Sequence, residues 1–423
     1  MSENNITANP KDYLWNYGAF ASLTIFGLLI NLLIAYFYGS SGLGRFAILY
    51  AIFVVTSQFS SFGIHYSALK DSASIKRNAE LQSVYSSNFF AVLLTSISFS
   101  ILLFLLSDFL EHLFESDQIS FSIKVLCPAV FLFGINKFFL SFLNGRSLFK
   151  IFAIGNIVRY ISLTLALCVL ISMSTPFKWI SLIFIFSEII VATFCLINIK
   201  KLKIYIIKFA SISEISERIR FGFKAMFSGL FIELNTRIDV LILGSFVSDS
   251  LVGVYSLFSL ISEGFYNLFT VIKNILNPRI TRYMTEGLFS EIKKLILRNI
   301  LIIYPIAITI SILISLTVYL LILYLPEASD YIDNMMILFI LLFSITLVSP
   351  FIPFELILTL SGYPELQSIQ SAILVLINII LNILLINLYG VVGAAIATAS
   401  CYIFGIILIS IFAIKKLGFK STS

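Results

Sequence analysis

Long apolar segments separated by short polar breaks occupy almost the whole chain. Each is about 20 residues long or longer, the length that a helix needs to cross the hydrocarbon core of a bilayer. We predict twelve membrane-spanning helices, near residues 14–38, 43–65, 84–107, 119–143, 150–172, 179–199, 224–246, 251–275, 299–325, 334–358, 367–388 and 391–414. The pattern is typical of an all-α integral membrane protein.

Composition supports this fold class. Hydrophobic residues make up 59% of the chain and charged residues only 12%, with a mean hydropathy of +1.02, whereas soluble domains carry about 25% charge. The first apolar segment is too long for the core of a cleavable signal peptide, so we expect it to be the first span. The cysteines lie inside predicted spans without ligand spacing, which predicts neither a disulfide framework nor a metal site: Cys127, Cys168, Cys195 and Cys401.

Lysine and arginine concentrate in alternate loops, which orients the chain because basic residues resist export to the outer face. Both termini are predicted to be cytoplasmic, and the most basic cytoplasmic segment is 200–224. The outer loops are acidic instead, as at Asp108, Glu111 and Glu327. The net charge of +6 therefore follows from this bias, with anionic lipid headgroups as partners, and needs no nucleic acid.

The basic segment after the sixth span divides the chain into two predicted six-helix lobes, residues 1–205 and 206–423. AYFYGSSGLGRFAILYAI, from Ala35, resembles LGSFVSDSLVGVYSLFSLI, from Leu243, with Gly44 and Gly253 in register. A second copy that enters the membrane from the same side predicts pseudo-two-fold symmetry about the membrane normal. The alternative is that any two aromatic-rich spans joined by a short glycine turn look alike.

Ionisable side chains within the spans are the main candidates for function, because burying one at mid-bilayer costs about 2.5–3.5 kcal/mol. Such groups usually face protein or water and mark a transport path. The seventh span holds Glu233, Arg237 and Asp239. Glu233 and Arg237 are four residues apart, so they can pair along the helix. Asp239 lies about 200° round the helix from Arg237 and needs a partner on another helix.

Glu188 in the sixth span and Glu263 in the eighth lie at comparable depth. Because a buried carboxylate takes up a proton or cation readily, the candidates for coupling to H⁺ or Na⁺ are Asp239, Glu233, Glu263 and Glu188. The alternative is that these groups form interhelical ion pairs that only fix the packing.

Basic side chains inside the spans are candidates for binding an anionic substrate. Arginine binds phosphate through two hydrogen bonds, and lysine binds it as a point charge. The predicted cavity cations are Arg237, Arg159, Lys137 and Lys273. Lys137 and Lys273 lie near enough to the cytoplasmic interface to extend to it instead, whereas Arg159 is deeper.

The sequence contains few residues or motifs that are typical of an enzyme active site. Its two histidines, His65 and His112, lie far apart. It contains no Walker A motif, dinucleotide fingerprint, HExxH or GxSxG, and no outer loop longer than about a dozen residues. We therefore expect a transporter without a cofactor rather than an enzyme.

Three stretches carry a resemblance to a known family: GSSGLGRFAILYAI, RIDVLILGSFVSDSLVGVYSL and YGVVGAAIATAS. With the twelve-span layout, the chain resembles the Wzx-type O-antigen and polysaccharide flippases of the MOP superfamily, which also contains the MATE drug exporters. The resemblance implies a V-shaped, two-lobed fold and alternating access. It also implies transport of an undecaprenyl-pyrophosphate-linked oligosaccharide between the leaflets of a bacterial inner membrane, with a polymerase and chain-length machinery as partners.

The resemblance transfers no substrate-contacting residue, because its motifs are degenerate. Two other functions stay open at this point: a cation-coupled exporter of small molecules or drugs with the same fold, and a membrane-embedded sugar polymerase or transferase.

Overall fold

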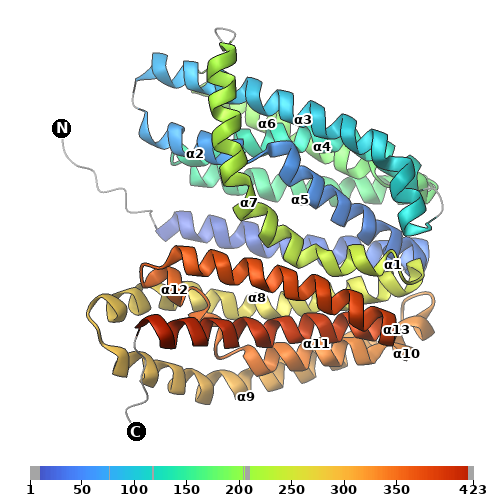
Figure 1. Ribbon diagram of the computed structural model, residues 1–423. Coiled ribbons are helices and arrows are strands. Elements are labelled where there is room, and N and C mark those ends of the chain that lie inside the picture. Colours follow the sequence, from blue (N-terminus) through green and yellow to red (C-terminus); the bar gives the residue numbers. More distant parts are fainter. Residues whose placement is uncertain (1–9, 76, 117–118, 203, 205–209, 418–423) are drawn as a thin grey trace. The chain divides into compact units, whose positions relative to one another are not determined.

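Helices form every regular element among the residues that the structure describes. This computed structural model describes residues 10–75, 77–116, 119–202, 204 and 210–417, and these ranges contain no strand (Figure 1). The helices are α1 (Pro10–Ser61), α2 (Ile64–Ser74), α3 (Asn78–Phe114), α4 (Ile119–Gly145), α5 (Phe149–Ser172), α6 (Leu182–Lys201), α7 (Ile212–Leu243), α8 (Asp249–Thr285), α9 (Phe289–Ile322), α10 (Ala328–Asp333), α11 (Met335–Val348), α12 (Ile357–Leu360) and α13 (Pro364–Leu417). Short 3₁₀ turns, η1 (Phe177–Trp179) and η2 (Ile352–Phe354), complete the order.

Two of the helices are long because each joins two predicted spans across a glycine. α1 contains Gly39 at φ 73°, and α13 contains Gly390 at φ 57°. Glycine adopts these left-handed angles without the steric penalty that a Cβ would bring. The chain therefore turns at each glycine while the helical hydrogen bonding continues on both sides. The second predicted span ends earlier than expected, at Ser61, because Phe62 and Gly63 also have positive φ.

The described helices fit a protein that crosses the membrane many times. Seven are long and apolar enough to span a bilayer, or eight when the bent pair of α11 with Ile352–Leu360 is counted as one span. α7 and α8 carry more charge but have 32 and 37 residues, more than the ~20 that a span needs. The predicted all-α membrane fold is thus confirmed.

The prolines in the spans act differently from one another. Pro128 and Pro305 lie inside continuous helices, α4 and α9. Pro350 and Pro353 lie instead at the 59° bend after α11, where a missing backbone N–H is tolerated.

The chain divides into two compact units. The first comprises the described residues of Met1–Leu33 and Leu49–Glu233, and the second those of Ile34–Ile48 and Leu234–Ser423. The chain therefore passes between the units twice inside α1, after Leu33 and after Ile48, and once more inside α7, after Glu233. The predicted lobe boundary at 205/206 falls among residues outside the described part, so the division into lobes and their symmetry stay predictions.

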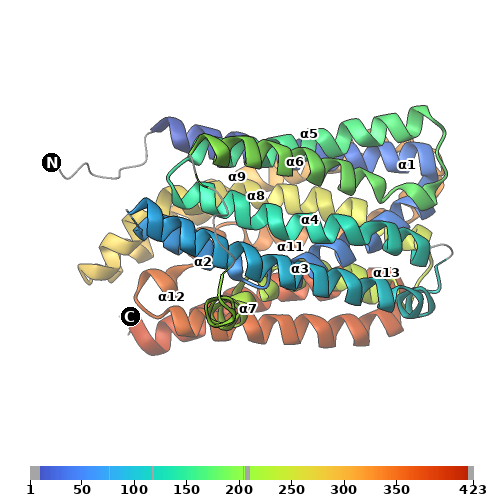
Figure 2. The ribbon, with the colours of Figure 1, turned by 90° about the horizontal axis from the view of Figure 1, so that it is seen from above.

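In the first unit, α3 packs on α4, and α4 packs on α6 and α2 (Figure 2). Small residues allow the close approach: a Cβ on Gly134 would lie 2.4 Å from Ser60 Oγ and 2.3 Å from Ser96 Oγ. Hydroxyl groups then bond across the helices, since Thr95 and Ser96 both donate to the carbonyl oxygen of Ser60. Close packing and interhelical hydrogen bonds are what hold helices together where lipid removes the hydrophobic driving force.

In the second unit, α8, α11 and α13 form the main contacts. Gly44 and Gly253, which the sequence repeat aligns, lie against each other here. A Cβ on Gly44 would lie 1.7 Å from the carbonyl oxygen of Asp249, and one on Gly253 would lie 2.1 Å from that of Ser40. The two glycines thus let the part of α1 after Gly39 contact α8 directly. This holds whether or not the two stretches arose from an internal repeat.

Candidate functional site

A charged cluster lies inside the first unit, between α5 and α6. Arg159 Nε donates to Glu188 Oε1 at 2.7 Å, and Arg159 Nη2 donates to Oε2 at 3.2 Å. Asn136 on α4 adds a third donor to the carboxylate, at 2.8 Å from Oε2. The side chains of Arg159 and Glu188 are only 11% and 2% exposed. The guanidinium also lies over the ring of Phe133, 4.7 Å from its centre.

Lys137 lies one residue beyond Asn136 on α4 but has a different environment. Its Nζ donates to Gln58 Oε1 on α1 at 2.6 Å. Arg159 and Glu233 are near enough to act on Lys137 electrostatically. The Gln58 amide is neutral, so this hydrogen bond does not itself neutralise the charge of the lysine.

In the second unit, Arg237 on α7 faces Glu263 on α8. The Nη1–Oε1 distance is 3.7 Å, longer than a hydrogen bond, and the two side chains are 21% and 27% exposed. The pairing of Arg237 with Glu233 along α7 stays a prediction. The structure therefore adds a partner on a neighbouring helix, which the sequence spacing did not predict.

Asp239 is more deeply enclosed than Arg237. It is 4% exposed, and it accepts hydrogen bonds from the Tyr255 hydroxyl on α8 and from the backbone N–H of Val240. The Tyr255 hydroxyl also lies 3.1 Å from Thr398 Oγ1 on α13. The sequence predicted that Asp239 needs a partner on another helix, and the structure supplies the Tyr255 hydroxyl. Arg237 on the same helix also acts on the carboxylate electrostatically.

Lys273 and Glu355 form an ion pair nearer the end of α8, at 2.9 Å. Tyr266 donates to the same carboxylate at 3.1 Å, and its ring stacks on that of Tyr402 at 5.3 Å between ring centres. The sequence suggested that Lys273 extends to the membrane interface. In the structure its ammonium group instead pairs with the Glu355 carboxylate inside the second unit.

Sequence reasoning found the charged members of these clusters but missed their neutral partners. The missed residues are Asn136, Gln58, Tyr255, Thr398 and Tyr266. Uncharged polar residues are common in spans and follow no spacing rule that would identify them. Among the described residues, no group of three or more His, Cys, Asp or Glu could hold a metal ion, and Cys168 is exposed whereas the other three cysteines are buried.

Comparison with solved structures finds proteins of similar fold. The fold is similar to that of lipid II flippase MurJ in an inward closed conformation, with a TM-score of 0.77 and 19% identity over 96% of this chain and 88% of that chain. It is also similar to an inward-facing MATE multidrug transporter of the MOP superfamily, with a TM-score of 0.75 and 14% identity over 95% and 96% of the two chains.

A Vibrio cholerae MATE transporter, VcmN, is less similar, with a TM-score of 0.57 and 14% identity over 97% of this chain and 98% of that chain. At these identities the likeness establishes a shared fold. No curated protein sequence matches the chain. The sequence model described as "Polysaccharide biosynthesis protein" matches residues 11–285. This chain belongs to the polysaccharide biosynthesis protein family.

Proposed function

We propose that this protein is a flippase for a lipid-linked oligosaccharide, such as an O-antigen repeat unit on undecaprenyl pyrophosphate. It carries the substrate from the cytoplasmic to the periplasmic leaflet of a bacterial inner membrane by alternating access. The observation that carries the proposal is the family match over residues 11–285, together with partly buried arginines among apolar helices. A polymerase and its chain-length machinery are the proposed partners that use the product.

The basic side chains inside the helices are candidates for binding the pyrophosphate or an acidic sugar of the substrate. Their contacts and exposure indicate which of them is best placed to do so. Arg159 is held by two hydrogen bonds to Glu188, and Lys273 lies 2.9 Å from Glu355, so both charges are already neutralised. Arg237 is the more exposed of the two arginines, at 21% against 11% for Arg159, so a substrate reaches it more readily. Lys137 donates to the neutral Gln58 amide, and Glu233 also acts on it electrostatically. We therefore propose Arg237 as the principal anion-binding residue and keep Lys137, Arg159 and Lys273 as further candidates.

Among the carboxylates, Asp239 is the best placed to couple transport to H⁺ or Na⁺. Its hydrogen-bond donors are a tyrosine hydroxyl and a backbone N–H, which carry no positive charge. Burial makes the carboxylate anion costly, although Arg237 is near enough to offset part of that cost electrostatically, and this cost favours uptake of a proton or a cation. Glu188 is a weaker candidate because Arg159 already neutralises it. Glu263 and Glu233 also remain proposed candidates for coupling transport to H⁺ or Na⁺.

Deletion of the gene tests the proposed substrate class. Loss of surface polysaccharide, with lipid-linked repeat units retained on the cytoplasmic side, is the expected result. Normal surface polymer in the deletion strain would refute the proposal, provided that no second flippase gene is present. Restoring the gene on a plasmid is the matching control.

A second candidate function is a cation-coupled exporter of small molecules or drugs. The similarity to a MATE multidrug transporter, with a TM-score of 0.75, favours it. Increased drug sensitivity of the deletion strain with intact surface polymer would support the exporter over the flippase.

A further inference from the structure

The first part of α7, residues 212–227, crosses the other helices of the first unit instead of running alongside them. Figure 1 shows this part passing over α2 and α3, and Figure 2 shows it nearly end-on. Helices that cross at a steep angle touch over a short length, so a few contacts decide whether this part of α7 stays in place.

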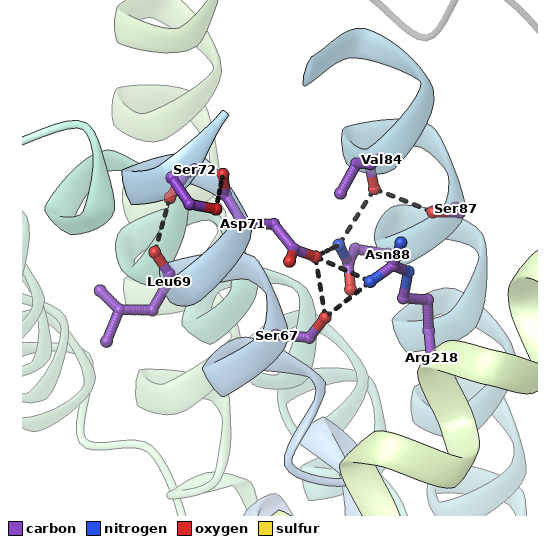
Figure 3. A network of polar contacts seen from close by, with 9 residues as sticks. Ser67, Leu69, Asp71, Ser72, Val84, Ser87, Asn88 and Arg218 are labelled. Atoms are coloured by element: carbon purple, nitrogen blue, oxygen red, sulfur yellow. Dashed lines mark hydrogen bonds and ion pairs between the residues drawn. The ribbon is translucent and has the colours of Figure 1, made fainter. Parts of the chain in front are cut away.

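One of these contacts is an ion pair between α7 and α2. Arg218 Nη1 donates to Asp71 Oδ2 at 2.8 Å and lies 3.4 Å from Ser67 Oγ. The side chains of Arg218 and Asp71 are 18% and 16% exposed, so solvent screens the pair only in part. Figure 3 shows the arginine reaching from α7 toward the two α2 residues.

Asp71 is already oriented to receive the arginine. Its Oδ2 accepts a hydrogen bond from Ser67 Oγ at 3.0 Å, on the same helix, and lies 3.4 Å from Asn88 Nδ2 on α3 (Figure 3). Asn88 also donates to the carbonyl oxygen of Val84 at 3.0 Å, which fixes its amide. The carboxylate is therefore preorganised, and little side-chain entropy is lost when Arg218 binds it.

The second contact is a direct approach of two backbones, one helical turn further along α7. A Cβ on Gly222 would lie 2.3 Å from the carbonyl oxygen of Phe62, and one on Gly63 would lie 2.3 Å from that of Gly222. Arg218, Gly222 and Met226 follow each other at four-residue intervals, so they share one face of α7. Met226 on this face is buried, whereas Lys224 is exposed.

We propose that these two contacts form a clamp and that Asp71 and Arg218 are positioning residues for transport. The clamp, defined as the Asp71–Arg218 pair with the Gly63–Gly222 contact, fixes residues 212–227 of α7 to α2. This part of α7 therefore moves with the first unit during the transport cycle. The chain then passes between the units inside α7, after Glu233, and not in the segment that precedes the helix. Only the consequence for transport depends on the proposed function.

Hydrogen exchange on the purified full-length protein tests the clamp without any substrate. In Arg218→Gln and in Asp71→Asn, amide exchange in peptides from residues 212–227 should rise about tenfold, because each change removes a charge-assisted hydrogen bond. Arg220→Gln is the matched control, since Arg220 is exposed on the same helix and should leave the exchange rate unchanged. Equal rates in all three variants and the wild type would overturn the proposal.

A glycine variant tests the backbone contact separately. Gly222→Ala places a methyl group on the carbonyl oxygen of Phe62, so exchange in residues 212–227 should also rise. Gly27→Ala is the control, because a Cβ at that helical position meets nothing within 4 Å. No difference between Gly222→Ala and Gly27→Ala would show that the two backbones do not need to touch.

The positioning role has its own readout. At equal amounts of membrane protein, Arg218→Gln should lower surface polysaccharide, and Arg218→Lys should restore much of it by keeping the charge. Wild-type polymer in Arg218→Gln, despite faster exchange, would overturn the positioning role. If deletion of the whole gene leaves the polymer intact, the proposed function fails, and the exchange experiment still decides the clamp.

Discussion

Removing both charges of the Arg159–Glu188 pair should be less harmful than removing one. Arg159→Met leaves the Glu188 carboxylate 2% exposed with Asn136 as its remaining side-chain donor. Breaking a buried pair in this way costs about 3–5 kcal/mol. In Arg159→Met/Glu188→Met, no buried charge is left, and Asn136 Nδ2 keeps its 2.7 Å hydrogen bond to the backbone carbonyl oxygen of residue 188. We expect the double variant to lose only about 1 kcal/mol.

Unfolding of the purified protein by SDS in mixed micelles, followed by tryptophan fluorescence, measures these differences. The two single variants and the double variant form a double-mutant cycle, whose coupling energy should be several kcal/mol. Because the pair is neutralised within the first unit, the double variant should also keep most of its transport activity. A double variant as unstable as the sum of the singles would refute the pairing. A stable double variant that cannot export polysaccharide would instead place Arg159 in the substrate path.

Three further changes test other parts of the account. At equal expression, Arg237→Ala should lower polysaccharide export about tenfold or more, by loss of a charge-assisted contact, and should lower it further than Lys273→Ala; equal effects would remove the special status of Arg237. Tyr255→Phe deprives the Asp239 carboxylate of a hydrogen bond, so transport should change its dependence on pH or Na⁺, and an unaltered ion dependence would argue against coupling at Asp239. The Tyr331 hydroxyl is buried without a hydrogen-bond partner in the described part of the chain, so Tyr331→Phe should leave stability unchanged or raise it by about 1 kcal/mol. Burial also raises the pKa of Tyr331, so the folded protein should lose stability above about pH 10, and thermal unfolding at rising pH should show a larger loss in the wild type than in Tyr331→Phe.

The apolar pattern predicted the helices well because the membrane allows so few alternatives. Every backbone polar group must be paired within the hydrocarbon, which leaves a helix of sufficient length as the solution for each apolar segment. The ends and joins of the helices were harder to predict. Gly39 and Gly390 break the helical angles without ending the hydrogen bonding, whereas Phe62 and Gly63 do end a helix. Sequence alone does not distinguish these glycines.

The candidate site was predictable only as far as charge reveals it. Charged groups in a span are rare, so Arg159, Glu188 and Asp239 stood out from the apolar background. Their partners depend on which helices lie side by side, and that is a tertiary property. Arg237 illustrates the limit, since helical spacing indicated Glu233 on its own helix but could not indicate Glu263 on α8.

The residues of the clamp could not be identified from the sequence either. Asp71 and Arg218 lie in polar segments that the sequence assigns to the cytoplasmic side, where charges are common and carry little information. Gly63 and Gly222 have no neighbouring motif that would mark them as a contact. Only the packing of α7 on α2 reveals that all four residues act together.

Reconstitution into proteoliposomes measures whether the protein moves a lipid-linked oligosaccharide across a bilayer. The purified protein is placed in vesicles that carry a lipid-linked oligosaccharide with a fluorescent sugar, and a membrane-impermeant quencher or lectin reports which leaflet holds the sugar. We expect the labelled sugar to cross the bilayer much faster in vesicles that contain the protein than in protein-free vesicles, and Arg237→Ala to slow this movement. Movement no faster than in protein-free vesicles, under both H⁺ and Na⁺ gradients, would contradict the proposed flippase function.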